Sequence, residues 1–574
     1  VYPQYPSGYA LLAAPFYKAF GVHGLMLVNA LSFAACMFLT FRLAERFYNA
    51  RVAAYAAAIF ALATFAPTYA FAIWPHMIAL LFWLAGFYLA VAAADAPNRK
   101  SRYLRLLFAG LAIGAGINIR IDVFLAAIAI FLWLRAFARP DDRLAPLALI
   151  VGAIPGLLLA ACLNDLNFGA FTPFSYSSSG GATDIHRYSF ILLAAGIASA
   201  ALWIFNTNKH FLRAYSAIGA LPLAALLVVA IGGAMLISPI RDLVLRLIDG
   251  VYVLVINLQA HDAYYQEGVE RNQYGHLLFW NYPKKALIQS LPFLPLILPP
   301  VFQALRSKTI PGPALALLAI AAPTAFYGLN EWHGGASYSM RYFIPALPFI
   351  AILSAATVNE LVEKSGSAPS RQAFLIILCL AAASYVGLQE IAQASERWLT
   401  PLSLYPQWLI AGVLTAAVIL HLRMPNATKL ARATLMISLF AIAYAGAINI
   451  YEEITHEKTR EEQLALSRDA SAPIRSGALV FSQLSLVLKP AEANGASIMT
   501  GTENNIADAA QAANAFARAG RCIYFHTPDQ AQLIGPHLEA AILKTPIWAP
   551  SKRFEHDPRL AFFVLEDQQA QCAF

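Results

Sequence analysis

One stretch of the sequence decides the fold class. Residues 76–94 read HMIALLFWLAGFYLAVAAA and contain no Asp, Glu, Lys or Arg. A helix of this length is about 29 Å long, which matches the ~30 Å hydrocarbon core of a bilayer. Comparable apolar segments lie at roughly 22–41, 52–70, 104–119, 121–135, 144–163, 188–205, 214–237, 287–305, 310–328, 343–361, 372–389, 407–422 and 433–450. The sequence therefore predicts an all-α polytopic membrane protein with about 14 transmembrane helices.

The composition of the whole chain agrees with this prediction. Of 574 residues, 59% are hydrophobic and 13% are charged, and mean hydropathy is +0.58. An average soluble domain carries about 25% charged residues, so a disordered chain, a disulfide-stapled small protein and a water-soluble enzyme with one core are disfavoured. Residues 1–450 hold 29 Lys and Arg against 17 Asp and Glu, whereas residues 451–574 hold 11 against 15. The basic excess thus belongs to the membrane part, and no basic stripe indicates a nucleic-acid partner.

The Lys and Arg residues of the loops predict the orientation. Nineteen of them lie in one alternating set of loops, at 42–51, 95–105, 135–143, 206–213, 305–308, 360–371 and 421–432. The other set holds only 9 in longer loops, at 66–76, 118–122, 164–187, 238–285, 329–342 and 390–406. Short loops rich in Lys and Arg stay in the cytoplasm. We therefore expect the second set, the stretch 1–21 and the C-terminal part to face outward, where long loops are usually functional.

Residues 451–574 are predicted to form a small outward α/β domain, separate from a membrane module of residues 1–450. Apolar runs at 478–481, 485–488, 522–525 and 560–565 are typical of strands, and 505–519 has the pattern of a helix. Cys522 and Cys572 can form a disulfide if this part faces an oxidising compartment. No Cys and His residues stand at metal-ligand spacing, so no cofactor is certain and nothing in the sequence supports a divalent metal.

The outward segment EWHGGASYSMRY (residues 331–342) is the strongest candidate site. Its paired glycines allow the backbone to approach a ligand closely. Arg341, at the start of a span, can bind a phosphate by two parallel hydrogen bonds. In the alternative interpretation, Arg341 reaches lipid headgroups, while Trp332 and Tyr342 belong to the aromatic belt.

Two further places carry polar residues beside apolar spans. Arg120 lies between two spans and must reach the surface or find a partner, and Asp122 can supply that partner by closing a helical hairpin. Asp184 and His186 precede another span, where they can bind a sugar hydroxyl or cap the helix, the expected role of Asp184. The glycines of Gly110-x3-Gly114-x-Gly116 lie within a span and predict close helix packing rather than a nucleotide loop.

Four segments of the sequence resemble a known family. YPSGYALLAAPFY (5–17), followed by VNAL (28–31), resembles the "YPPGYPLLLAPFY…LVNAL" pattern of bacterial GT-C membrane glycosyltransferases. These are relatives of dolichyl-phosphate-mannose–protein mannosyltransferases (glycosyltransferase family 39) and of lipid A aminoarabinose transferases. NIR (118–120) resembles their "LTRP" segment, and FGAFTP (168–173) with Tyr176 is similar to "FGSPLxTGY". Residues 332–345 are similar to "WxGGxSxGPRYxxPxLP".

This resemblance implies a GT-C fold and a polyprenyl-phosphate-linked sugar as donor. It also implies transfer with inversion on the periplasmic face of a bacterial inner (plasma) membrane. The partners would be membrane lipids, the lipid-linked sugar and a glycolipid, polysaccharide or protein acceptor. Arg341 and then Arg120 fit the lipid phosphate, with Tyr5 and Tyr342 beside it. The residues expected to contact substrate are Trp332, His333, Tyr176, Asp184 and His186.

The family's catalytic Asp lies upstream of the YPPGY segment. The chain begins at Val1, directly before that segment, so this residue is expected upstream of Val1. Among the residues present, Glu331 is the candidate base. Two other functions stay open: a transporter or flippase of lipid-linked substrates, and a non-catalytic scaffold subunit with a GT-C-like fold. The spans show no paired midplane charges and no inverted repeat, which argues against the transporter.

Overall fold

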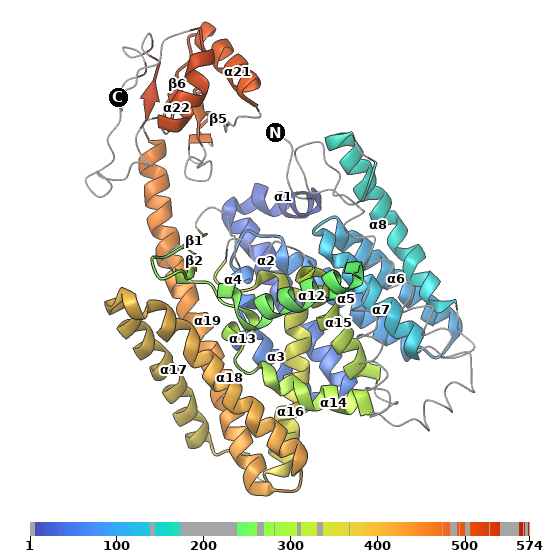
Figure 1. Ribbon diagram of the computed structural model, residues 1–574. Coiled ribbons are helices and arrows are strands. Elements are labelled where there is room, and N and C mark those ends of the chain that lie inside the picture. Colours follow the sequence, from blue (N-terminus) through green and yellow to red (C-terminus); the bar gives the residue numbers. More distant parts are fainter. Residues whose placement is uncertain are drawn as a thin grey trace. The chain divides into compact units, whose positions relative to one another are not determined.

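Figure 1 shows the computed structural model of the chain. It describes residues 6–574 except 138–143, 170, 174–237, 261–268, 280–281, 307–310, 330–336, 367, 473, 483–490, 493, 500–504, 527, 540–561, 566–567, 569–571 and 573–574. The chain forms two compact units, Val1–Glu452 and Glu453–Phe574.

The first unit is built mainly from helices. Its N-terminal part contains α1 (Gly8–Phe20), α2 (Val22–Phe47), α3 (Ala50–Leu62), α4 (Ala66–Ala70), α5 (His76–Ala94), α6 (Arg99–Ile117), the 3-10 turn η1 (Ile121–Val123), α7 (Phe124–Phe137) and α8 (Ala145–Phe168). After residue 237 come α12 (Ser238–Val251), the π-helical turn η2 (Tyr252–Ile256), η3 (Leu258–Ala260), α13 (Leu287–Ser290), η4 (Leu294–Ile297), α14 (Leu298–Arg306), α15 (Pro311–Gly328), η5 (Arg341–Ala346), α16 (Leu347–Lys364), α17 (Arg371–Ala394), η6 (Glu396–Trp398), α18 (Leu399–Arg423) and α19 (Thr428–Ser471).

Seven helices of the described part are long and apolar enough to cross a membrane. They are Val22–Phe47, His76–Ala94, Ala145–Asn167, Arg341–Lys364, Arg371–Ala394, Glu396–Arg423 and Thr428–Thr455. Shorter apolar helices cover Ala50–Leu62, Leu294–Ala304 and Gly312–Gly328. The predicted spans 188–205 and 214–237 lie outside the described residues. The total of 14 spans stays a prediction, and the mainly helical, multi-pass membrane architecture is confirmed.

Two predicted spans are not single helices. The segment 52–70 breaks between α3 and α4, where the Thr64 hydroxyl accepts a hydrogen bond from the Ala66 N–H at 3.2 Å and Pro67 follows. The segment 287–305 breaks into α13, η4 and α14 around Pro292 and Pro295. Proline lacks the N–H that continues a helix and disfavours helical geometry in the residue before it. A hydropathy average over these segments cannot detect such breaks.

Glycines bring α6 and α8 close together. A Cβ on Gly110 would collide with the Leu149 carbonyl, and one on Gly114 would collide with the Ala153 carbonyl. On the facing helix, a Cβ on Gly156 would meet the backbone of Gly114. Small residues of this kind let helix backbones approach inside a membrane. The prediction of close helix packing at these glycines is confirmed.

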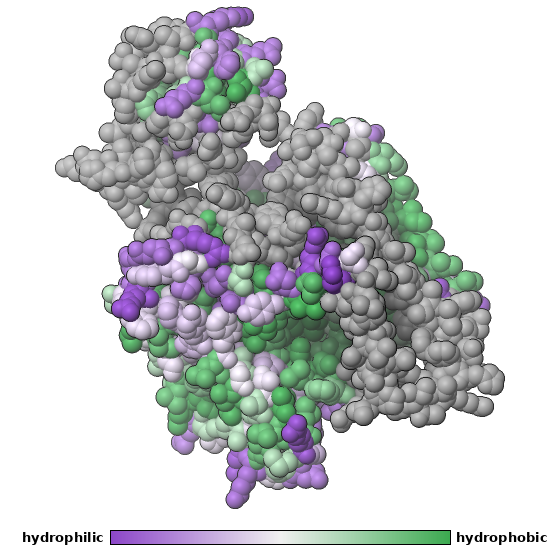
Figure 2. Space-filling model, in the orientation of Figure 1, coloured by the Kyte–Doolittle hydropathy of each residue, from purple (hydrophilic) through white to green (hydrophobic). Residues whose placement is uncertain are grey.

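The outer surface of the first unit carries broad apolar areas, drawn green in Figure 2. Helix α17 contributes exposed side chains such as Ile376, Leu380 and Ile391, which are 55–58% exposed. Exposed apolar area on this scale is expected of a surface that contacts lipid.

A small sheet interrupts the helices between η3 and α13. Strands β1 (Val269–Arg271), β2 (Leu277–Phe279) and β3 (Tyr282–Pro283) pair antiparallel in the order β1-β2-β3. Within the predicted loop 238–285, the chain therefore forms the helix α12 and this sheet. The last strand ends at Pro283, and Lys284, Lys285 and Ala286 lead from it to α13.

The second unit contains a four-stranded sheet in the order β5-β4-β6-β7. Strand β4 (Leu479–Phe481) is parallel to β5 (Ser497–Met499) and to β6 (Ile523–Phe525), whereas β7 (Phe563–Val564) is antiparallel to β6. Helices α21 (Ile506–Arg518) and α22 (Pro528–Ile534) belong to the same unit. A disulfide joins Cys522, directly before β6, to Cys572.

Candidate functional site

Residues from three parts of the first unit meet around one pocket. Its lining includes His76 at the start of α5, Arg120 and Asp122 at η1, and Arg341 at the start of η5. The apolar part of the wall comes from Ala79, Leu80, Trp83, Val123, Ile344 and Pro345. The pocket volume is about 10 Å³, which is room for about one water molecule.

Arg120 is held on both sides by buried groups. Its Nε donates to both Asp122 oxygens at 3.0 and 3.3 Å, and its Nη2 donates to Oδ2 at 2.9 Å. The Tyr327 hydroxyl, at the end of α15, donates to the same Oδ2 at 2.7 Å. Both carboxylate oxygens of Asp122 are thus engaged, and the pair that the sequence allowed as an alternative is formed. Asp122 is therefore the counter-ion of Arg120.

The contact between Arg120 and His76 fixes the tautomer of the imidazole. Arg120 Nη1 lies 3.0 Å from His76 Nε2, and a guanidinium can only donate. Nε2 therefore accepts, and the neutral ring carries its proton on Nδ1. His76 Nδ1 is buried and has no hydrogen-bond partner among the described residues. His76 thus brings an unused N–H donor to the pocket region.

Arg341 is the other cation of the pocket, and it is only 5% exposed. Its guanidinium carbon lies 4.9 Å from the Trp74 ring centroid and 5.5 Å from that of Tyr342, so aromatic faces partly offset its lost hydration. No carboxylate within the described ranges forms an ion pair with it, and its Nε–H has no acceptor there. A buried cation without a counter-ion is costly in a low-dielectric setting, and an anion in the pocket would relieve that cost.

The local backbone explains why Arg120 is well placed. Asn118 donates from Nδ2 to the carbonyls of Gly114 and Gly156, at 3.0 and 2.9 Å, which fixes the end of α6 against α8. The Asn118 carbonyl accepts from the Gly8 N–H at 2.9 Å, and a Cβ on Gly8 would collide with that carbonyl. The glycine of the motif at residues 5–17 is therefore needed for α1 to dock beside the segment that carries Arg120.

Two stacked tyrosines, Tyr327 at the end of α15 and Tyr342 in η5, connect the residues around Arg120 with those around Arg341. The Tyr327 and Tyr342 rings stack with centroids 4.4 Å apart and an interplanar angle of 16°. Tyr327 binds Asp122 and Tyr342 follows Arg341, so the stack links the Arg120 side to the Arg341 side.

Of the predicted site residues, Arg120 and Arg341 line the pocket, and Tyr342 follows Arg341 in η5. The other predicted site residues lie outside the described residues: Tyr5, Tyr176, Asp184, His186, Glu331, Trp332 and His333. Trp74, His76 and Tyr327 lie at or beside this pocket and were not among the residues expected from the sequence. The motif Trp74-Pro75-His76, in an outward loop at the start of a span, could have indicated the first two residues. No sequence pattern indicates Tyr327, which lies at the end of a span.

A lysine lies near Arg341. Lys284 is fully buried, and its Nζ donates to the Ser337 carbonyl at 2.9 Å. Burial, and then the charge of Arg341, lowers the pKa of Lys284 to about 7. Within the described ranges, no three His, Cys, Asp or Glu side chains are grouped as a metal site would require.

The sequence and the fold of the chain are similar to those of known proteins. Residues 5–163 match the family model described as dolichyl-phosphate-mannose-protein mannosyltransferase. The chain is similar to GT-C glycosyltransferases. The resemblance seen in the sequence motifs is thereby confirmed, and the family match itself covers residues 5–163 of the 574. No curated protein matches the chain.

Several solved GT-C structures are similar over most of the chain. ArnT from Cupriavidus metallidurans in its apo state has 13% identity and a TM-score of 0.46, covering 98% of this chain and 88% of ArnT. The same protein bound to undecaprenyl phosphate has 12% identity and a TM-score of 0.42, with 100% and 89% covered. The apo oligosaccharyltransferase of Archaeoglobus fulgidus has 15% identity and a TM-score of 0.47, with 95% and 62% covered. All three TM-scores are below 0.5, and the similarity to the family rests on the match over residues 5–163.

Proposed function

We propose that this protein transfers a sugar from a polyprenyl-phosphate-linked donor to a glycolipid, polysaccharide or protein acceptor. Transfer would take place on the periplasmic face of the bacterial inner membrane, with inversion at the anomeric carbon. The observation that carries the proposal is the buried Arg341, which has no carboxylate partner among the described residues and lines a pocket beside His76.

The groups that line the pocket can donate hydrogen bonds to an anion placed beside them, and the pocket itself has room for about one water molecule. Arg341 offers a positive charge and an unused Nε–H, and His76 offers an unused Nδ1–H. A lipid-linked phosphate would place its prenyl chain in the bilayer and its head group at these donors. When the sugar leaves, charge develops on the phosphate, and the preorganised Arg341 would stabilise it. Arg120 is already neutralised by Asp122, so we assign it to holding the pocket together.

The direction of transfer agrees with two features of the chain. The Lys-rich and Arg-rich loops predict that the pocket lies at the outward ends of its helices. The disulfide between Cys522 and Cys572 supports an oxidising compartment for the second unit, such as a bacterial periplasm. For catalysis, Glu331 remains our candidate for the base that removes the acceptor proton.

Binding of undecaprenyl phosphate to the purified, detergent-solubilised protein tests the assignment of Arg341. We expect Arg341→Ala to weaken binding by 100-fold or more, and Arg341→Lys to retain part of it. Arg397→Ala is the matched control, because Arg397 is also an arginine beside an aromatic ring at a helix start in an outward loop, but it is exposed. Wild-type affinity in the Arg341→Ala variant would show that the assignment is wrong.

Two assays separate the three functions. An enzyme would transfer labelled sugar from the polyprenyl-phosphate donor to a membrane or periplasmic acceptor, and it would lose this activity in the Arg341→Ala variant. Counter-transport of labelled lipid in liposomes without sugar transfer would indicate the flippase instead. Lipid binding with neither reaction would indicate the scaffold.

A further inference from the structure

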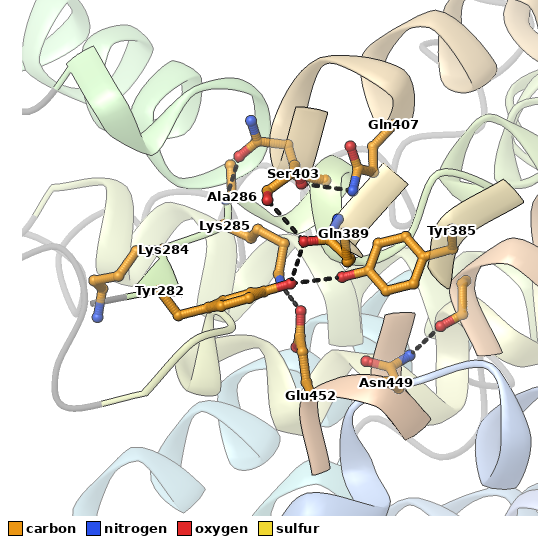
Figure 3. Close-up of polar contacts among 12 residues, drawn as sticks. Tyr282, Lys284, Lys285, Ala286, Tyr385, Gln389, Ser403, Gln407, Asn449 and Glu452 are labelled. Atoms are coloured by element: carbon orange, nitrogen blue, oxygen red, sulfur yellow. Dashed lines mark hydrogen bonds and ion pairs between the residues drawn. The ribbon is translucent and has the colours of Figure 1, made fainter. Parts of the chain in front are cut away.

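Two adjacent lysines follow the small sheet, and both are completely buried. Lys284 and Lys285 are each 0% exposed. Their side chains leave the backbone in different directions: that of Lys285 points toward Glu452, and that of Lys284 points away from it (Figure 3). The segment Tyr282–Lys285 therefore makes polar contacts on two sides at once.

On one side, the segment is fixed to the C-terminal helices of the first unit. Lys285 Nζ forms an ion pair with Glu452 of α19, whose side chain is only 7% exposed. The Tyr282 hydroxyl lies 3.0 Å from that of Tyr385 and donates to Gln389 Oε1 at 2.8 Å, both on α17. The Ser403 hydroxyl of α18 donates to the same Oε1 at 2.8 Å (Figure 3). Helices α17 and α19 thus hold one short segment, and α18 supports Gln389.

On the other side, the same segment holds the stretch that leads to Arg341. The Lys285 N–H donates to the Tyr338 carbonyl at 2.9 Å, and Lys284 Nζ donates to the Ser337 carbonyl at 2.9 Å. The Tyr338 ring packs edge-on against Tyr282, with centroids 5.4 Å apart. Two residues later the backbone turns, because the Arg341 N–H donates to the Ser339 carbonyl at 2.9 Å.

Joining two elements by a buried ion pair carries a large desolvation cost. Removing two charges from water costs several kcal/mol each, and well-packed apolar side chains often give equal or greater stability. A buried pair with directional partners does, however, restrict the geometry of what it joins. The contacts here run continuously from Glu452, through Lys285 and the backbone of Tyr338, to the turn before Arg341.

We propose that the Lys285–Glu452 ion pair and the Tyr282 hydrogen-bond network form a clamp that positions Arg341 for the lipid phosphate. Lys284 is part of this clamp through its contact with Ser337. These are positioning residues, because they act on the ligand through Arg341. The inference rests on the proposed function of Arg341.

Glu452→Gln is the direct test, with undecaprenyl phosphate as the probe and the full chain in detergent. We expect the dissociation constant to rise at least tenfold, because the 337–341 stretch loses one of its anchors. The charge-swapped double variant Lys285→Glu/Glu452→Lys should recover most of the affinity, since it restores an ion pair. Asp95→Asn is the matched control, because it breaks the pair between Arg46 and Asp95 at the predicted cytoplasmic side, and it should leave the affinity unchanged.

Binding stoichiometry separates positioning from simple loss of fold. A purely structural role would lower the number of binding-competent molecules and leave the dissociation constant of the remainder unchanged, which would overturn the clamp. Wild-type affinity in Glu452→Gln, together with weak binding in Arg341→Ala, would also overturn the clamp but leave the proposed function intact. Wild-type affinity in Arg341→Ala would instead overturn the proposed function itself.

Discussion

Replacement of Asp122 by Asn tests the charge balance of the pocket. Asp122 is 7% exposed, and its two oxygens accept three contacts from Arg120 and one from Tyr327. An Asn side chain of the same shape can still accept from Tyr327, but its amide N–H group faces the donors of Arg120. The substitution therefore leaves a buried, uncompensated guanidinium with little change of volume.

The expected loss can be worked from these contacts. Breaking a buried ion pair by removing one partner costs about 3–5 kcal/mol, because the remaining charge stays desolvated. Tyr327→Phe removes one hydrogen bond to a charged group, for which about 1.5–3 kcal/mol is typical. Asp122→Asn should therefore destabilise the first unit by about 2 kcal/mol more than Tyr327→Phe. The double variant Arg120→Met/Asp122→Asn should be more stable than Asp122→Asn alone, since it also removes the stranded charge.

Unfolding by SDS titration, followed by Trp fluorescence, measures these differences on the full chain. The four proteins wild type, Arg120→Met, Asp122→Asn and the double variant form a double-mutant cycle. We expect a coupling energy of at least about 2 kcal/mol. Additive effects, or an Asp122→Asn variant within about 1 kcal/mol of wild type, would refute the argument that Asp122 neutralises Arg120.

Three further predictions concern other parts of the chain. The pKa of Lys284 is about 7 in the folded protein and near 10.5 when unfolded. Between these pH values the unfolded state binds more protons, so the free energy of unfolding should rise with pH, by at most about 1.4 kcal/mol per pH unit. SDS titrations at pH 6 and pH 9 should show a smaller rise of this free energy in the Lys284→Met variant than in the wild type. The disulfide between Cys522 and Cys572 joins residues 50 apart in the sequence, and its reduction should destabilise the second unit by about 4 kcal/mol. Limited proteolysis should then cleave this unit faster in dithiothreitol. An unchanged rate of cleavage would contradict the prediction. Gly8→Val should push α1 away from the Asn118 carbonyl and cost about 1–3 kcal/mol, whereas Gly412→Val, at a position with open space around it, should cost less.

The sequence predicts most of what depends on hydropathy and little of what depends on long-range packing. The helix over 76–94 follows from its uninterrupted apolar character, and the breaks within 52–70 and 287–305 arise from prolines and local turns that a window average hides. Arg341 stood out because a charge at the start of a span requires an explanation. His76 could not be assigned to the same site, because its role depends on Arg120, 44 residues away in the chain.

Arg120 and Arg341 look alike in the sequence, since each is a single arginine beside an apolar span, and they are about equally buried. Their difference comes from one neighbouring residue: Asp122 follows Arg120 at two residues' distance and takes up its charge, whereas residues 342–346 contain no acid. The pocket therefore combines a neutral pair, which holds three elements together through His76 and Tyr327, with one cation that lacks a counter-ion in the described part of the chain. Binding of a lipid phosphate would complete that charge balance without any change in the pair.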